Sequence, residues 1–156
     1  MKKCISVIGG AECSSDEYNT ALEVGREIAS RGAITVCGGL GGVMEAVSKG
    51  AKDAGGITIG ILPGSDKGDA NSFIDIPIVT GLGGARNFLV ALTADAVIAV
   101  GGALGTLSEL AFSMKNKKPV VGIGTWDLDK RYCEKVNIVK ANSAKDAVGK
   151  AFSLIR

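Results

Sequence analysis

Short apolar segments that end in clusters of glycine recur along this chain, and a segment with helical periodicity follows each of them. The apolar segments are Cys4–Ile8, Ala33–Cys37, Ile76–Val79 and Ala96–Val100, with glycine clusters at 9–10, 38–42, 81–84 and 101–105. Continuous apolar segments that alternate with helices are typical of parallel strands buried on both faces. We therefore predict an α/β fold, a Rossmann-like three-layer sandwich with helices on both faces of a mostly parallel sheet.

The 156 residues suit one domain, 1–156, that is large enough to build a full core. Further strands are expected at Ile57–Ile61, Val120–Ile123 and Val136–Val139, and helices at Ser14–Arg31, Val43–Ala54, Arg86–Ala94, from Thr106, and from Ser143 to Arg156. Ser14 and Glu17 have the spacing of a capping box, and Pro77 indicates an edge strand. The polar segment Leu62–Ser72 is either a binding loop or an exposed connection.

Glycine at a strand-to-helix turn lets backbone N–H groups approach a ligand, because no Cβ stands in the way. In open parallel sheets, ligands bind beyond the carboxyl ends of the strands, near the point where the strand order reverses. Tight turns explain some of these glycines, but not readily the clusters at four strand ends. The candidate ligand-binding glycines of the first two units are Gly9, Gly10, Gly38, Gly39, Gly41 and Gly42.

The stretch from Ala96 to Glu109 carries the strongest functional signal. A buried strand passes through a glycine-rich turn into an amphipathic helix, whose start offers unpaired N–H groups and a partial positive charge to an anion such as phosphate. The candidate ligand-binding residues here are Gly101, Gly102, Ala103, Leu104, Gly105, Thr106 and Glu109. The helix start is also expected to keep Glu109 ionised near neutral pH. A capping box between Thr106 and Glu109 explains the segment equally well without a ligand.

Composition excludes several classes of function. The chain has no histidine, which removes Ser-His-Asp and Cys-His catalysis and histidine metal sites. A net charge of +2 and 4% aromatic residues argue against nucleic acid as a partner. No apolar run is long enough for a membrane span, and the first residues lack the features of a signal peptide. The four cysteines show no zinc spacing, so we expect no bound metal and a reduced, cytoplasmic protein in which Cys13 is the candidate reactive thiol.

The glycine motifs differ from two common nucleotide-binding templates. The chain contains no Gly-x-x-x-x-Gly-Lys-Ser/Thr sequence, which excludes a Walker A site. The turns at Gly9 and Gly39 begin like a dinucleotide fingerprint but lack its third spaced glycine. An NAD enzyme is therefore disfavoured.

Three motifs, taken in order, resemble those of the Lonely Guy and molybdenum-cofactor-carrier-like superfamily. They are Gly38–Ala46, Gly84–Asn87 and Gly101–Glu109, within a stretch from about Val7 to Ile123. In the Lonely Guy cytokinin-activating phosphoribohydrolases, the last motif is Pro-Gly-Gly-x-Gly-Thr-x-x-Glu, and an Arg-Lys pair opens the preceding helix. On that alignment, the matching residues are Gly105, Thr106 and Glu109, with Arg86 at the place of the functional arginine.

Four positions depart from the hydrolase pattern. Gly101 replaces proline, Ala103 replaces glycine, Ser108 replaces a common first glutamate and Asn87 replaces lysine. The Arg-Asn pair and the Leu-Ser-Glu ending resemble more closely the carrier-like branch, whose members are associated with holding a phosphate-bearing pterin cofactor. The resemblance therefore implies a small phosphate-bearing ligand, either a molybdenum cofactor or a nucleoside monophosphate, bound by the glycine turns together with Arg86 and Asn87.

The alternative that the resemblance leaves open is a nucleoside 5′-monophosphate phosphoribohydrolase. In that case Glu109 and Arg86 would be catalytic: Glu109 would bind the ribose or position a water, and Arg86 would orient Glu109 or the substrate while the N-glycosidic bond breaks. Neither function requires a cofactor by sequence, and the sequence does not decide whether the chain is an enzyme. The resemblance also implies a homodimer or homotetramer.

Overall fold

A parallel sheet forms the centre of the molecule in the computed structural model, which describes residues 1–129, 131 and 137–155. Its strands are β1 (Cys4–Gly9), β2 (Ile34–Cys37), β3 (Ile57–Leu62), β4 (Ile76–Val79), β5 (Ala96–Val100), β6 (Val120–Ile123) and β7 (Ile138–Lys140). Their order is β4-β3-β2-β1-β5-β6-β7, and each neighbouring pair is parallel. The order reverses between β1 and β5, so the carboxyl ends of these two strands flank the crevice in which such sheets bind ligands.

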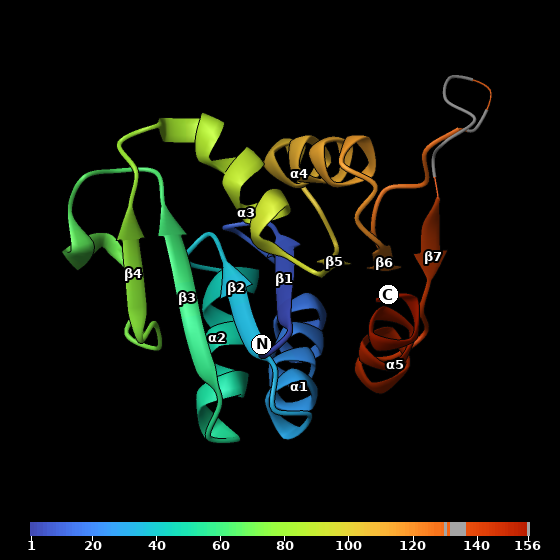
Figure 1. Cartoon of the computed structure of the whole chain (residues 1–156), viewed down its shortest axis with the longest axis horizontal. Coiled ribbons are helices and arrows are strands. Elements are labelled where there is room, and N and C mark those ends of the chain that lie inside the picture. The colour runs from blue at the N-terminus through green and yellow to red at the C-terminus, as the bar shows by residue number, and fades with distance from the viewer. Residues whose placement is uncertain (130, 132–136, 156) are drawn as a thin grey trace.

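Helices cover both faces of this sheet (Figure 1). They are α1 (Ser15–Ser30), α2 (Val43–Asp53), α3 (Asn87–Thr93), α4 (Leu104–Lys115) and α5 (Ala144–Leu154). Helices α1, α2 and α5 lie on one face, and α3 and α4 lie on the other. The predicted Rossmann-like three-layer α/β sandwich is thus confirmed. None of the described helices is long and apolar enough to cross a membrane.

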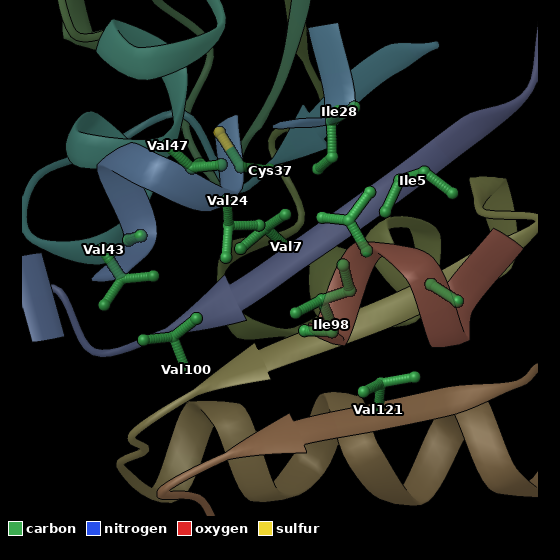
Figure 2. Close-up of a cluster of buried hydrophobic side chains, with 14 of the residues drawn as sticks. Ile5, Val7, Val24, Ile28, Cys37, Val43, Val47, Ile98, Val100 and Val121 are labelled. Atoms are coloured by element: carbon green, nitrogen blue, oxygen red, sulfur yellow. The ribbon is translucent and has the colours of Figure 1, made fainter. Parts of the chain in front are cut away.

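The side chains of the central strands alternate between two halves of the core. Ile5 and Val7 of β1 and Ile98 of β5 pack against α1, α2 and α5 (Figure 2). Ile8 and Val97, their neighbours in sequence, pack on the opposite face with α3 and α4. Because both faces are covered, these strands have no polar side, which explains why they are continuous apolar segments in the sequence.

Helices α1 and α2 contact each other through glycines. A Cβ at Gly50 would lie 1.9 Å from the carbonyl oxygen of Leu22, and one at Gly25 would lie 2.1 Å from a carbonyl oxygen of α2. We expect Gly50→Ala to lower the free energy of unfolding by about 2–3 kcal/mol, because the helices must separate to make room. Urea denaturation followed by circular dichroism measures the loss.

Gly149→Ala in α5 is the matched control for this prediction. The nearest atom to a Cβ at Gly149 is the end of the Arg31 side chain, at 3.7 Å. An added methyl group there should be neutral or stabilise the helix by up to about 1 kcal/mol. Equal losses in the two variants would contradict the close contact between α1 and α2.

Several element boundaries follow the local rules of the sequence. The capping box between Ser14 and Glu17 is present at the start of α1, as predicted. Strand β4, which contains Pro77, lies at an edge of the sheet, also as predicted. The last strand is Ile138–Lys140, whereas the prediction started it at Val136; Val136 and Cys133 lie outside the described residues.

Two helix starts differ from the prediction. Residues Gly83–Arg86 form a 3-10 turn, so the α-helix that was expected to begin at Arg86 begins at Asn87. Helix α4 begins at Leu104, two residues before the expected Thr106. It begins early because Ala103 adopts an extended conformation (φ −119°, ψ −173°), which places the helix cap there.

Candidate functional site

A cavity of about 270 Å³ lies where the carboxyl ends of β1 and β2 meet the starts of α3 and α4. Nine of the candidate residues from the sequence line it: Gly9, Gly10, Gly38, Arg86, Asn87, Ala103, Gly105, Thr106 and Glu109. Five apolar residues that the sequence did not single out complete the lining: Val7, Ile8, Ala11, Leu40 and Met44. Nothing in the sequence separates these apolar residues from ordinary core positions, because only the fold brings them to the cavity.

The remaining candidates lie in the turns beside the cavity and do not line it. They are Gly39, Gly41, Gly42, Gly101, Gly102 and Leu104. The φ angles of Gly39 and Gly42 are 78° and 63°, a backbone conformation that favours glycine, so the turn itself accounts for these two residues. The side chain of Leu104 is 79% exposed and points away from the core.

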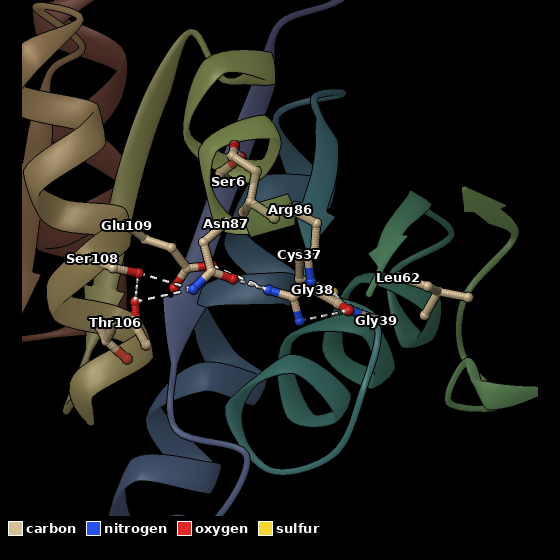
Figure 3. Close-up of polar contacts among 12 residues, drawn as sticks. Ser6, Cys37, Gly38, Gly39, Leu62, Arg86, Asn87, Thr106, Ser108 and Glu109 are labelled. Atoms are coloured by element: carbon tan, nitrogen blue, oxygen red, sulfur yellow. Dashed lines mark hydrogen bonds and ion pairs between the residues drawn. The ribbon is translucent and has the colours of Figure 1, made fainter. Parts of the chain in front are cut away.

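Arg86 is the buried positive charge of the cavity, with 7% of its surface exposed. Its Nη2 donates to the carbonyl oxygen of Gly38 at 3.3 Å, and its Nη1 donates to Oδ1 of Asn87 (Figure 3). Nη1 also lies 3.7 Å from Oε1 of Glu109. Burial lowers the pKa of Arg86 and the Glu109 charge opposes this, but guanidinium groups stay charged in proteins. The cavity therefore contains a fixed cation, whose buried Nε has no hydrogen-bond partner among the described residues.

Glu109 faces Arg86 from the second turn of α4 and is 5% exposed. Burial raises the pKa of its carboxyl group to about 7, although the charge of Arg86 opposes the rise. The prediction that the helix start keeps Glu109 ionised near neutral pH is therefore wrong. The helix dipole acts most strongly within the first helical turn. Because α4 begins at Leu104, Glu109 lies in the second turn, where this effect is weaker. A carboxyl group with this pKa exchanges its proton near neutral pH.

The capping box suggested by Thr106 and Glu109 is not formed. Thr106 is the third residue of α4, and its Oγ1 accepts a hydrogen bond from the N–H of Ala103 at 3.3 Å. Glu109 lies too far along the helix to bond to its first residue and instead faces the cavity. The helix start is thus capped by Thr106, which leaves the carboxyl group of Glu109 available to the cavity.

Asn87 and Ser108, two of the positions that depart from the hydrolase pattern, are hydrogen-bonded to each other. Nδ2 of Asn87 donates to Oγ of Ser108 at 2.9 Å, and this hydroxyl donates to the carbonyl oxygen of Gly105 at 2.7 Å. Together with the bond from Arg86 to Asn87, these contacts connect the buried guanidinium to the first turn of α4. The two departures are therefore structurally coupled, and the pair that they form is uncharged.

The segment Leu62–Ser72 is attached to the second glycine turn. The backbone N–H of Asn71 donates to the carbonyl oxygen of Gly39 at 2.8 Å, and its Nδ2 donates to that of Leu40 at 2.9 Å. The segment also contains a 3-10 turn at Lys67–Asp69. Its far end thus supports the turn that carries Gly38, although none of its residues lines the cavity.

The described residues around Cys13 do not activate its thiol. Burial and the charges of Glu17 and Glu45 raise the pKa of its thiol, which lowers the thiolate fraction near neutral pH. Within residues 1–129, 131 and 137–155, no three His, Cys, Asp or Glu side chains come together as a possible metal site.

Two solved structures match this chain over nearly its whole length. The molybdenum cofactor binding protein of the phototrophic bacterium Rippkaea orientalis is 38% identical with a TM-score of 0.93, and the match covers 100% of this chain and 99% of that one. The molybdenum cofactor carrier protein of Chlamydomonas reinhardtii is 38% identical with a TM-score of 0.88, and the match covers 98% of each chain. These similarities confirm the fold and the resemblance to the carrier-like branch.

Sequence comparison gives the same relationship. An uncharacterized protein of Archaeoglobus fulgidus is 47% identical over 119 residues, which are 76% of this chain and 78% of that protein. The profile of the SLOG cluster4 family matches residues 2–151. Because this match spans nearly all of the strands and helices described above, the chain belongs to the SLOG cluster4 family.

Proposed function

We propose that this chain binds and carries a molybdenum cofactor or a similar pterin cofactor, which it holds through the phosphate group. The observation that supports this most directly is the position of the glycine turn at the start of α4. This turn and the buried Arg86 line one cavity, at the point where the strand order reverses. Parallel sheets bind their ligands at that point.

The phosphate would lie on the backbone of residues 102–106. The first N–H groups of an α-helix have no partner within the helix, and they carry its partial positive charge. Gly105 lines the cavity and has no side chain, so an oxygen can approach these groups there, and Arg86 adds a full positive charge from the cavity wall. Ala103 contributes a methyl group to the lining, and its extended backbone directs the chain into the helix.

The number of carboxyl groups in the cavity favours a carrier over a hydrolase. Glycoside hydrolysis ordinarily uses two carboxyl groups on opposite sides of the bond that breaks. Glu109 is the one carboxyl group among the residues that line the described cavity. Where the hydrolase motif has its other glutamate, this chain has Ser108, which is bonded to Asn87. The pKa of Glu109, about 7, suits an acid–base residue and keeps phosphoribohydrolase activity as the second candidate.

Analysis of the native ligand tests the proposal. Protein purified from a host that makes molybdenum cofactor should release a phosphate-bearing pterin, detected by mass spectrometry, in an amount that approaches one per binding site. Gly105→Val, which places a branched side chain in the phosphate turn, should abolish this co-purification. Protein that carries no such compound, and that binds neither inorganic phosphate nor adenosine 5′-monophosphate in calorimetry, would contradict the proposal.

We also propose that the chain assembles into a homodimer or homotetramer. Helices α3 and α4 expose apolar side chains, with Phe88 36%, Leu92 42% and Leu104 79% exposed. Apolar side chains that stay exposed on neighbouring helices favour burial against a protein surface. Light scattering at micromolar concentration should give a multiple of the 15.8 kDa chain mass, and a monomer would refute the assembly.

A further inference from the structure

We infer that a second cavity, beside Trp126, holds the planar heteroaromatic ring of the phosphate-bearing ligand. This inference rests on the proposed function, because it takes the phosphate to lie on residues 102–106. It adds the place where the rest of the ligand binds and the side chain that recognises it.

The second cavity lies at the carboxyl end of β6 and along β7, and it has a volume of about 630 Å³. Strand β6 is the neighbour of β5, so this cavity opens at the same edge of the sheet as the phosphate turn. Ligand-binding cavities for drug-sized molecules measure roughly 300–1,000 Å³. The cavity at Arg86, about 270 Å³, therefore suits the phosphate and its immediate surroundings, whereas the larger cavity has room for a ring system.

Trp126 connects the two sites. Its Nε1 donates to the carbonyl oxygen of Ala103 at 3.3 Å. The indole also lies over Gly102, where a Cβ would come within 2.9 Å of Nε1. The contact with Gly102 and Ala103 fixes one edge of the indole against the phosphate turn, while 37% of the residue stays exposed. An aromatic ring held in this way provides a flat surface on which a heterocycle can stack.

The other walls of the cavity carry neutral polar groups. Asn137 and Asn142 line it, and each side-chain amide offers both donors and an acceptor to the edge of a heterocycle. Gly122 also lines the cavity, and Thr125 packs closely against it, since a Cβ at Gly122 would lie 2.5 Å from Cγ2 of Thr125. The buried hydroxyl of Thr125 has no partner among the described residues, so its hydrogen-bonding capacity is unmet.

Among the described residues that line the cavity, the two charged side chains form an ion pair. Nζ of Lys140 lies 2.9 Å from Oδ2 of Asp127, and both side chains are well exposed. This pair neutralises itself, so the cavity presents polar groups without a net charge from these two residues. Such a lining suits an uncharged ring with several hydrogen-bonding atoms, as in a pterin or a purine, better than a second phosphate.

Calorimetry with matched probes tests this inference. Adenosine 5′-monophosphate and a pterin monophosphate carry a ring, whereas ribose 5-phosphate does not. At least one ring-bearing probe should bind with an affinity at least about tenfold higher than that of ribose 5-phosphate. Stacking of a base on an aromatic side chain raises the affinity by about 5- to 150-fold. Because Trp126 is the single tryptophan of the chain, binding of the same probe should also change the intrinsic fluorescence.

Two variants of Trp126 separate stacking from structural damage. Trp126→Leu should lower the affinity for the ring-bearing probe about tenfold. Its affinity for ribose 5-phosphate should stay within about twofold of the wild-type value, and this result would show that the phosphate turn is intact. Trp126→Phe keeps an aromatic ring and should retain most of the affinity. Equal binding of all three probes, without a fluorescence change, would overturn this inference and leave the phosphate site standing. Binding of none of the probes would overturn both the inference and the proposed function.

Discussion

Arg86→Met is expected to weaken the binding of adenosine 5′-monophosphate by at least about 30-fold. The guanidinium is buried, is held by Gly38 and Asn87, and is the one positive side chain among the described residues that line the cavity. Truncation of one partner in a buried, hydrogen-bonded charge pair costs about 2–5 kcal/mol, which corresponds to about 30-fold or more in affinity. Methionine fills similar volume without the charge, and titration calorimetry measures the loss.

Two further variants make this prediction specific. Arg26→Met removes an exposed arginine of α1 that pairs with Glu23 and Asp53, and it should leave binding unchanged. Arg86→Lys keeps the charge but lacks the planar fork that contacts Gly38 and Asn87 together, so its affinity should be intermediate. If Arg86→Met folds and binds as tightly as the wild type, the ligand does not use this cation.

The sequence predicted the architecture well because the fold depends on signals that are local. The continuous apolar segments of β1 and β5 exist because both faces of these strands are covered, and Gly39 and Gly42 stand where the turn requires positive φ. Such features depend on a few neighbouring residues. They can therefore be recognised without knowing which elements pack together.

The chemistry of the site depends on contacts between distant residues and was predicted less well. The proton affinity of Glu109 follows from its burial against Arg86, and the sequence indicated only its place near a helix start. Asn87 and Ser108 looked like two separate departures from a motif, but they are hydrogen-bond partners across α3 and α4. Trp126 gave no signal in the sequence, because its contact with Ala103 joins two loops far apart in the chain.

Glu109 should make ligand binding depend on pH above neutrality. In the free protein the pKa of its carboxyl group is about 7. A phosphate bound nearby adds negative charge, which raises this pKa further, so binding above pH 7 requires uptake of a proton. Among the described residues, the other titratable groups that interact with Glu109 are Arg86 and the Cys37 thiol, whose pKa burial raises above its ordinary value. Neither of them changes charge between pH 7 and 9.

The direction in which affinity changes with pH distinguishes the titration of Glu109 from the titration of the ligand's phosphate. The second ionisation of a phosphate monoester has a pKa near 6, so it strengthens binding as pH rises and is about 90% complete at pH 7. Protonated Glu109 becomes scarcer above pH 7, so wild-type affinity for adenosine 5′-monophosphate should fall by up to about 50-fold from pH 7 to pH 9. Glu109→Gln is neutral throughout and should show less than about threefold change over the same range.

The same variant distinguishes carrying from hydrolysis. We expect the wild type to release little adenine from adenosine 5′-monophosphate, and Glu109→Gln to retain its affinity at pH 7. Chromatography of the reaction mixture measures adenine and ribose 5-phosphate directly. If the wild type instead releases both products and Glu109→Gln loses about 100-fold or more in turnover, Glu109 is an acid–base residue and the chain is a phosphoribohydrolase. If the affinity of the wild type is as flat from pH 7 to pH 9 as that of the variant, the bound phosphate does not lie close to Glu109.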